Sequence, residues 1–452
     1  MAELQGRRRF AHLFRRAGFG PNEAELNAAM ALNPDENTAF NLAVDSLLNY
    51  QNVPEVADRF SPTDPSVTPD LVVESSTILW WLDRMVRTRR PLLEKMTLFW
   101  HDHFATSGEK EGIIPRMASQ NELLRQNALG NFENMLRAIS RDPSMMLWQD
   151  IVSNKKGNPN ENFARELMEL FSIGIGQPNS PNYSEADIKE ATRAFTGYTI
   201  GTDGNWALNS AQHDSGTKTV LGQTCESGDD VMHILVNFKK NNKNVCSRFI
   251  AAKLFSWFVW PVTPDDPLVD GFATTFVNSN LSIKSLMDAI LKSPQFSSNA
   301  AYRSQEKNPV EVSVGALRTL GAERFPYRGA FARTAELGMR LFFPPDVGGW
   351  TSGRGWINAS TLIGRWNMQG EICVRMGMPE ALDPGGPPAQ NTMAGMTDPA
   401  QKVDRLLYLL VDSNVSDAER NALITFSQRG NDTGTLLGLI SLVMALPAYQ
   451  LN

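Results

Sequence analysis

The chain has 452 residues, of which 42% are hydrophobic and 20% are charged, so it can bury the core of one large domain or a few average ones. Its net charge of −6 provides no global basic field, which disfavours nucleic acid as a partner. Met1 leads directly into a polar, arginine-rich segment instead of the apolar core of a signal peptide, a pattern that predicts a cytoplasmic protein.

The first predicted helix carries a histidine among basic residues. Five arginines lie in this segment: Arg7, Arg8, Arg9, Arg15 and Arg16. A charge run of this kind usually forms a solvated helix face, and we interpret it in that way. His12 lies beside Arg15 and Arg16, and histidine is a common proton carrier near neutral pH. His12 is therefore a candidate catalytic residue, with a helix-surface histidine as the alternative.

The motif FWHDHF ends a helix predicted to begin at Pro91, a residue suited to the first helical position. Apolar residues recur at helical spacing through Phe104. Successive helical residues turn by about 100°, so His101 and His103 cannot bind one ion side by side on a helix. His103 falls on the apolar face and His101 at its margin. Both are candidate metal ligands, and a hydrogen-bonded core histidine is the alternative for His103.

The segment NENFARELMELF (160–171) predicts an amphipathic helix. Glu161, Arg165 and Glu169 are spaced four apart and predict a ladder of ion pairs, whereas Glu166 lies between the two faces. Helical bundles hold di-metal centres with such carboxylates together with histidines, although the full Glu-x-x-His pattern is absent here. Glu166 and Glu169 are candidate metal ligands, and Arg165 is a candidate for orienting a carboxylate. The alternative is an ordinary charged helix face.

Residues 198–222 combine short β-favouring pieces with a centre rich in Gly, Asn, Asp and Ser, which predicts a small β-hairpin inserted between helices. Within it, HDSGTKTVLG offers His213 and Asp214 as candidate metal ligands and Lys218 as a candidate catalytic residue. The alternative is an Asx turn with a surface histidine.

The segment PPDVGGWTSGRGWIN predicts a loop, because prolines and paired glycines disfavour regular structure. Trp350 and Trp356 are candidate substrate-binding residues that could stack on a planar or sugar ligand. The alternative is an aromatic plug that packs the loop against helices.

The domain prediction is a main helical domain over residues 1–378 with the hairpin insertion, a Pro/Gly linker over residues 379–400, and a C-terminal helical segment over residues 401–452 packed on the main domain. The longest apolar run, LLGLISLVMAL, is too short for a bilayer, which needs about 20 residues, so we expect no transmembrane segment. The predicted fold class is mainly α, a large multi-helix globular domain with a small β-hairpin insertion.

The motifs together suggest a metal-dependent enzyme of unknown substrate, oxidative or hydrolytic, that uses iron, manganese or zinc. The six expected ligands are His101, His103, Glu166, Glu169, His213 and Asp214. No Walker A loop or GxGxxG motif is present, so we expect no nucleotide. One alternative is a non-enzymatic scaffold or export-linked binding module whose polar clusters are structural networks. A weaker alternative is a carbohydrate-binding or carbohydrate-modifying protein.

Several long motifs occur in a fixed order: HLFRRAGFGP, RPLLEKMTLFWHDHFATS, NENFARELMELFSIG, HDSGTKTVLGQ and PPDVGGWTSGRGWINASTLIGRWN. With them the chain resembles the bacterial domain-of-unknown-function family numbered eighteen hundred, from His12 to Asn367 and onward. The resemblance implies an exported or periplasmic setting and a protein partner from a neighbouring gene, against the cytoplasmic prediction above. It carries over no catalytic residue.

Overall fold

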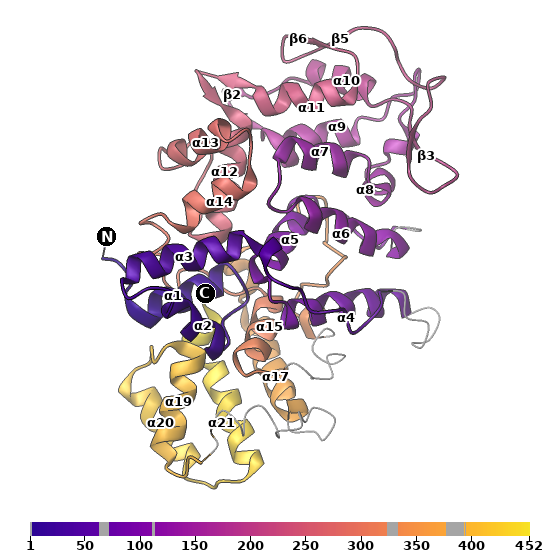
Figure 1. The fold of residues 1–452 in the computed structure, drawn as a ribbon. Coiled ribbons are helices and arrows are strands. Elements are labelled where there is room, and N and C mark those ends of the chain that lie inside the picture. Colours follow the sequence, from indigo (N-terminus) through magenta and orange to yellow (C-terminus); the bar gives the residue numbers. More distant parts are fainter. Residues whose placement is uncertain (1, 63–71, 111–113, 323–332, 377–392, 394) are drawn as a thin grey trace. The chain divides into compact units, whose positions relative to one another are not determined.

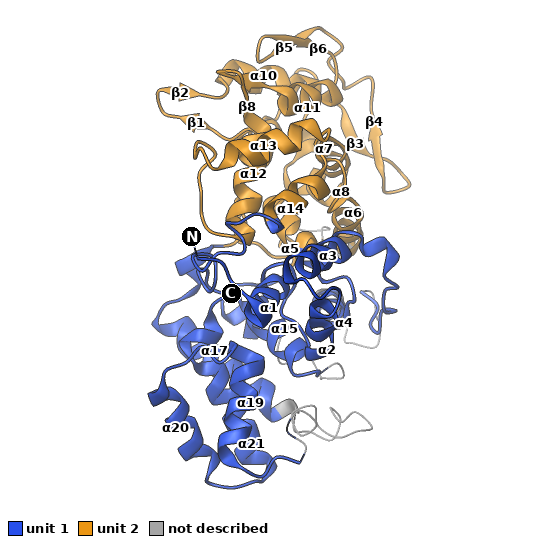
Figure 2. Cartoon of the chain, turned by 60° about the vertical axis from the view of Figure 1, so that its left-hand side comes forward, with its two compact units in different colours: residues 1–95, 291–341, 351–452 blue, residues 96–290, 342–350 orange. Residues whose placement is uncertain are grey.

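The computed structural model describes residues 2–62, 72–110, 114–322, 333–376, 393 and 395–452 (Figure 1). The prediction of a mainly α-helical chain is confirmed, because strands in the described part form only two-stranded antiparallel sheets. The chain divides into two compact units (Figure 2). Unit 1 comprises residues 1–95, 291–341 and 351–452, and unit 2 comprises residues 96–290 and 342–350.

Unit 1 begins with three short helices that pack on one another: α1 (Gly6–Arg16), α2 (Glu23–Met30) and α3 (Glu36–Leu48). The side chain of Asn22 caps α2 and forms a reciprocal capping box with Glu25, as the spacing of these residues predicts. Asp35 caps α3 through the backbone N–H of Thr38. These caps satisfy N–H groups that have no partner inside a helix.

The rest of unit 1 is built around α15, which packs against α4 and α17. Its helices are α4 (Val72–Arg87), the first residues of α5 (Pro91–His103), α15 (Pro309–Thr319), α17 (Ala359–Met376), α19 (Pro399–Val411), α20 (Asp417–Ser427) and α21 (Thr433–Ala445). The predicted C-terminal segment is therefore helical, and α21 packs against α17 and α19. The predicted linker lies mostly outside the described residues. No described helix is long and apolar enough to cross a bilayer.

The basic side of α1 is buried, so the prediction of a solvated helix face was wrong for most of it. Arg9, Arg15 and Arg16 are all buried, and Arg8 remains exposed. Burial is tolerated because later segments of unit 1 supply polar partners. Arg9 donates to Ser297 and Asn37, and Arg16 donates to the carbonyl oxygen of Ala301. These partners are distant in sequence, which is why the charge run alone did not reveal them.

Unit 2 contains the remainder of α5 and all four two-stranded sheets of the described residues. Its helices are α6 (Met117–Asn127), α7 (Phe132–Ser140), α8 (Pro143–Trp148), α9 (Asn162–Glu166), α10 (Glu185–Ala194), α11 (Gly228–Asn237), α12 (Val245–Phe258), α13 (Val269–Asn278) and α14 (Ile283–Leu291). The helix α12 packs against both α11 and α13, and most of its residues are buried. The apolar character of this segment therefore reflects its place in the core of the unit.

The predicted hairpin at residues 198–222 is two hairpins in the structure. The strand β3 (Tyr198–Ile200) pairs with β4 (Trp206–Leu208), and β5 (Lys218–Val220) pairs with β6 (Gln223–Cys225). The second hairpin turns at Leu221 and Gly222, which both have positive φ angles. A two-residue turn of this kind matches the twist of adjacent strands. This short turn pairs β5 with β6, the strand that directly follows it, whereas β3 pairs with β4.

Candidate functional site

The histidine motif lies at the end of α5 in unit 2, where His101 holds a loop. Its Nε2 atom accepts a hydrogen bond of 3.1 Å from the backbone N–H of Phe342. Its ring also lies 5.3 Å from the rings of Phe342 and Trp350, centroid to centroid. Burial lowers the pKa of His101 to about 3, so the imidazole is neutral at pH 7. His101 therefore acts as an acceptor that anchors residues 342–350.

Asp102 lies under the same loop. Its Oδ1 atom accepts a hydrogen bond of 2.8 Å from the backbone N–H of Trp350. Burial raises the pKa of Asp102 to about 7, although this hydrogen bond and the charge of Lys253 act in the opposite direction. Gly349 permits the close approach, since a Cβ atom there would lie 2.4 Å from Oδ1 of Asp102. The carboxyl group is therefore poised to change charge near neutral pH.

Lys253 brings a second titratable group to this site from α12. Its amine donates to the carbonyl oxygen of Leu170 at 3.3 Å and lies 5.0 Å from the centre of the Phe249 ring. Burial lowers the pKa of Lys253 to about 8, and the charge of Asp102 raises it. Asp102 and Lys253 thus influence each other electrostatically, and both change charge within about a unit of pH 8.

His103 is a core histidine, as its place on the apolar face of the predicted helix indicates. Its Nε2 atom lies 3.1 Å from the carbonyl oxygen of Phe171, so this nitrogen carries the proton. The ring stacks on Phe99 and contacts Phe104 edge-on. Burial, reinforced by the charge of Lys253, lowers the pKa of His103 well below its ordinary value. His103 is therefore neutral at pH 7 and donates to the backbone.

A π-helix supplies the carbonyl groups that receive these two donors. The helix α9 continues directly into a π-helix over Leu167–Ser172. Leu170 and Phe171 lie in its last turn, where carbonyl groups have no partner inside the helix. Lys253 and His103 bond to these two carbonyl oxygens. π-Helical turns are rare in proteins, and those that occur are often located at functional sites.

The π-helix also explains why the predicted ion-pair ladder is incomplete. Arg165 pairs with Glu161 at 3.0 Å as predicted, and with Glu185 at 2.8 Å. The predicted pair with Glu169 is not formed, and Glu169 accepts a hydrogen bond of 3.0 Å from the Tyr183 hydroxyl instead. A π turn holds more residues than an α turn, so residues beyond it rotate away from the α-helical face. Arg165 is thus engaged by surface carboxylates.

Of the remaining residues of the predicted metal site, His213 and Asp214 have hydrogen-bond partners of their own. Glu166 is half-buried, and burial together with the charge of Glu169 raises its pKa. His213 donates from Nδ1 to the carbonyl oxygen of Thr196 at 2.8 Å. Hydrogen bonding to Arg193, whose Nε atom lies 2.8 Å away, lowers the pKa of Asp214 to about 2. The adjacent aspartate therefore binds an arginine and does not orient the imidazole.

Lys218, which was predicted as a catalytic residue, forms hydrogen bonds to the backbone on both sides of the second hairpin. Its amine is buried and donates to the carbonyl oxygens of Asp214 and Glu226, the latter at 2.7 Å. Burial lowers the pKa of Lys218. Its two backbone acceptors fix the loop between β4 and β5 against the start of α11, which is a structural role.

The described residues do not fit the predicted metal centre. Among them, no group of three or more His, Cys, Asp or Glu side chains is placed to share an ion. The two histidines of α5 each bond to a backbone group, and His213 bonds to a carbonyl oxygen. Such contacts engage the three predicted histidine ligands with the backbone and not with one another. We therefore derive no chemical step through a metal.

The two candidate sugar-stacking tryptophans are buried. Trp350 is 7% exposed and Trp356 is 6% exposed. Trp350 contacts His101, and the backbone carbonyl oxygen of Trp356 accepts a hydrogen bond of 3.1 Å from Thr361. Neither indole presents an open face to a ligand, so the geometry favours packing and gives the carbohydrate hypothesis no support.

His12 lies in the interior of unit 1, not on a helix surface. Its ring packs 4.8 Å from the ring of Phe296, centroid to centroid. Burial, followed by the charges of Arg16 and Arg15, lowers the pKa of His12 well below its ordinary value. The imidazole is therefore neutral at pH 7. It adjoins a buried arginine cluster rather than the acid–base groups of unit 2.

A cavity of about 220 Å³ lies in unit 1 beside the start of α21. Its lining includes Lys402, Asn431 and Asp432. None of the predicted site residues lines it, and it is smaller than the ~300 Å³ at which typical ligand pockets begin. It gives no functional assignment.

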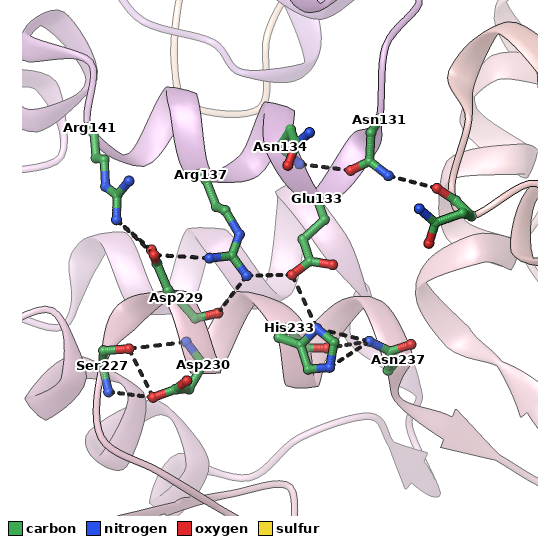
Figure 3. Close-up of polar contacts among 11 residues, drawn as sticks. Asn131, Glu133, Asn134, Arg137, Arg141, Ser227, Asp229, Asp230, His233 and Asn237 are labelled. Carbon is green, nitrogen blue, oxygen red and sulfur yellow. Dashed lines mark hydrogen bonds and ion pairs between the residues drawn. The ribbon is translucent and has the colours of Figure 1, made fainter.

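A charge-balanced ion-pair cluster links α7 and α11 at the surface of unit 2 (Figure 3). Arg137 and Arg141 both pair with Asp229, at 2.9 Å and 2.7 Å. Glu133 pairs with Arg137 and lies 3.1 Å from Nδ1 of His233. Each partner is partly exposed to solvent. Such a cluster fixes the packing of two helices and makes only a small contribution to stability.

Sequence reasoning missed Asp102 and Lys253 as site residues. Lys253 is the one charged residue in the stretch FIAAKLFSWF, and an isolated lysine in a buried helix needs a partner. That signal was available and would have flagged Lys253. No comparable signal paired it with Asp102, because the two lie far apart in sequence on α5 and α12.

A sequence model of the family described as "Protein of unknown function (DUF1800)" matches residues 12–451. No curated protein and no solved structure matches the chain. The match spans nearly the whole sequence, including α5, the π-helix and the loop over Asp102. The chain therefore belongs to the DUF1800 family.

Proposed function

We propose that this protein is an enzyme whose unit 2 performs acid–base chemistry with Asp102 and Lys253. The observation that supports it is a carboxyl group with a pKa of about 7 and an amine with a pKa of about 8 whose charges act on each other. Groups that titrate near the working pH are effective in proton transfer. Perturbed pKa values of this kind gather at functional sites.

The two groups have complementary protonation states between pH 7 and pH 8. There Asp102 is mostly ionised and can accept a proton, and Lys253 is mostly protonated and can donate one. Hydrogen bonds hold both groups in place. The backbone N–H of Trp350 donates to Asp102, and the amine of Lys253 donates to the carbonyl oxygen of Leu170. Hydrolysis requires proton transfers of this type, so the hydrolytic form of the enzyme hypothesis fits the site.

A first test needs no substrate. Competitive acetylation of the full chain with acetic anhydride across pH 6–11, read by mass spectrometry, reports the pKa of individual amines. We expect Lys253 to titrate near 8 and to shift lower in Asp102→Asn, because the charge of Asp102 raises the pKa of Lys253. The exposed Lys243 serves as an internal control. A Lys253 amine that titrates near its ordinary value of 10.5 contradicts the proposal.

A second test is activity on a panel of ester, amide, glycoside and phosphoester substrates. We expect a bell-shaped pH–rate profile with its maximum between pH 7 and pH 8. Asp102→Asn and Lys253→Met should each lower the rate by about 10²- to 10⁴-fold, the usual effect of losing an acid or base. Asp229→Asn, in the surface cluster of Figure 3, is the matched control and should leave the rate unchanged. Full activity in Asp102→Asn contradicts the proposal.

A non-enzymatic scaffold or binding module is the second candidate. It is favoured by the hydrogen bonds that His101, His103 and Lys253 each form with a backbone group. A cation and an N–H donor at the end of a helix satisfy its last carbonyl groups and complement its dipole. In this case Lys253→Met lowers stability, and no substrate of the panel gives a rate that depends on Asp102.

A further inference from the structure

Unit 1 contains a carboxylate surrounded by three arginines. Asp412 lies just after α19, and its Oδ1 atom is 2.7 Å from Nη1 of Arg7. Its Oδ2 atom is 2.6 Å from Nη1 of Arg15 and 3.3 Å from Nη2 of Arg303. The hydroxyl of Tyr302 also donates to Oδ2 at 3.1 Å. The first, middle and last parts of unit 1 therefore meet at one carboxylate.

The charges of this cluster do not balance. Asp412 is 1% exposed, and the side chains of Arg15 and Arg303 are 5% and 4% exposed. Within the described residues, Asp412 is the only carboxylate that forms an ion pair with any of the three arginines. Three guanidinium groups pair with one carboxylate, so two of these positive charges have no ion-pair partner of their own among the described residues. Buried charge that is not compensated is costly, so an excess of this size requires an explanation.

The positive charges of this cluster also act on a neighbouring lysine. Lys307 is buried, and its amine lies 3.8 Å from the centre of the Tyr449 ring. Burial lowers the pKa of Lys307 well below its ordinary value, and the charges of Arg303 and Arg15 lower it further, whereas the carboxylates of Glu311 and Asp412 act in the opposite direction. Negative charge that entered the cluster would likewise favour the protonated form of this amine.

Unused hydrogen-bond donors show where an anion would bind. Nε and Nη2 of Arg15 are buried and have no hydrogen-bond partner, although Nη1 of the same residue binds Asp412. These two atoms form the edge of a guanidinium group that grips an oxyanion with two parallel hydrogen bonds. Nε of Arg7 is also buried without a partner. Buried donors normally have partners, so these three mark a site for an acceptor.

The rim of the cluster reaches solvent at Arg7. The side chain of Arg7 is 14% exposed, and its guanidinium group lies 3.8 Å from the centre of the Tyr408 ring. Tyr408 is itself 38% exposed. Arg7 and Tyr408 are therefore the part of the cluster that meets solvent.

We propose that the cluster formed by Arg7, Arg15, Arg303 and Lys307 around Asp412 binds a small dianionic oxyanion, either free or as a phosphoryl or sulfuryl group of a larger ligand. A dianion cancels the two uncompensated charges, and its oxygen atoms accept from the free edge of Arg15. Arginine suits this role because its planar fork matches tetrahedral oxyanions. The proposal is independent of the acid–base site, since every residue in it belongs to unit 1.

The direct test is isothermal titration of the full chain at pH 7 with sodium phosphate and sodium sulfate, at constant ionic strength set with sodium chloride. We expect saturable binding of one ion per chain, with acetate binding at least about ten-fold more weakly because it carries one charge. If phosphate and sulfate give no saturable heat, the proposal is overturned.

Variants locate the binding site. Arg15→Gln should weaken phosphate binding at least about ten-fold, but its burial makes folding of this variant a concern. Arg7→Gln, at the partly exposed rim, is the second variant and should weaken binding by a smaller factor without loss of fold. Arg8→Gln on the same helix is the matched control, because Arg8 is exposed. Phosphate affinity equal to that of the native chain in a folded Arg7→Gln and a folded Arg15→Gln overturns the proposal.

Discussion

The two units each enclose an aspartate, and the two carboxyl groups differ in charge state. Burial raises the pKa of both. At Asp412 the charges of Arg15, Arg303 and Arg7 outweigh burial and bring the pKa to about 2. At Asp102 one backbone N–H and the charge of Lys253 do not outweigh it, and the pKa rises to about 7. The number of cations in contact, more than burial, therefore decides whether an enclosed carboxyl group is a fixed charge or a proton carrier.

The surface cluster of Figure 3 gives a third reference point. Asp229 also has two arginine partners, Arg137 and Arg141, yet all three are partly exposed. Solvent screens these charges, so the same kind of contact has a much smaller energetic consequence there. The three aspartates thus separate the effect of burial from the effect of ion pairing.

The largest expected effect is from Asp412→Asn. It leaves the buried Arg15 and Arg303 and the partly exposed Arg7 without their carboxylate, and losing one partner of a buried ion pair typically costs about 3–5 kcal/mol of unfolding free energy. Urea denaturation followed by circular dichroism measures the change. A loss no larger than that of Asp229→Asn would show that the excess positive charge around Asp412 is screened.

A smaller loss is expected from Gly349→Ala. Gly349 has a φ angle of +85°, and an added Cβ atom would lie 2.4 Å from Oδ1 of Asp102. Backbone strain and overpacking together should cost about 2–4 kcal/mol. Gly204→Ala is the control, because Gly204 has a φ angle of +80° but nothing within 4 Å of the added atom. Equal losses in the two variants would mean that the loop moves away from Asp102 at little cost.

The pH dependence of stability should distinguish the two buried aspartates. Asp102 has a folded pKa of about 7, above its ordinary 3.8, so the folded state binds more protons between these values and its stability falls as pH rises through this window. Asp412 has a folded pKa of about 2, so its contribution is present above pH 3.8 and is lost as pH falls toward 2.

Thermal unfolding of Asp102→Asn and of the native chain from pH 4 to pH 8 tests this difference. We expect the variant to gain stability relative to the native chain as pH rises from about 4 to about 7. A difference that stays constant over this range would mean that Asp102 titrates at its ordinary pKa.

The smallest effect should come from Asp229→Asn. Its ion pairs with Arg137 and Arg141 are partly exposed, so the loss should be about 0.2–1 kcal/mol and should shrink in high salt. Urea denaturation at two salt concentrations measures it. A loss of unfolding free energy above about 2 kcal/mol would mean that these ion pairs behave like buried ion pairs.

Local pattern was sufficient to predict most of the fold and little of the site. The helix that starts at Pro91 follows from spacing within a few residues. The π-helix did not, because one extra residue in a turn leaves the apolar pattern of NENFARELMELF almost unchanged. That single residue moved Glu169 away from Arg165.

The site residues depend on contacts between distant segments. Nothing near His12 in the sequence indicates that Arg15 is buried against Asp412, about four hundred residues later in the chain. The imidazoles of α5 were predicted as metal ligands because of their chemistry, and their backbone partners at Phe342 and Phe171 come from other parts of unit 2. The sequence shows the chemistry of each side chain, but it does not show which residue each side chain contacts in the folded protein.

The most direct test is a titration of the aspartate carboxyl groups by ¹³C NMR, using the full chain labelled at aspartate Cγ. We predict one resonance that titrates near pH 7 and disappears in Asp102→Asn, and another that stays ionised down to about pH 2 and disappears in Asp412→Asn. If the Asp102 resonance titrates below pH 5, cation number does not separate the two carboxyl groups, and the acid–base assignment of unit 2 is contradicted.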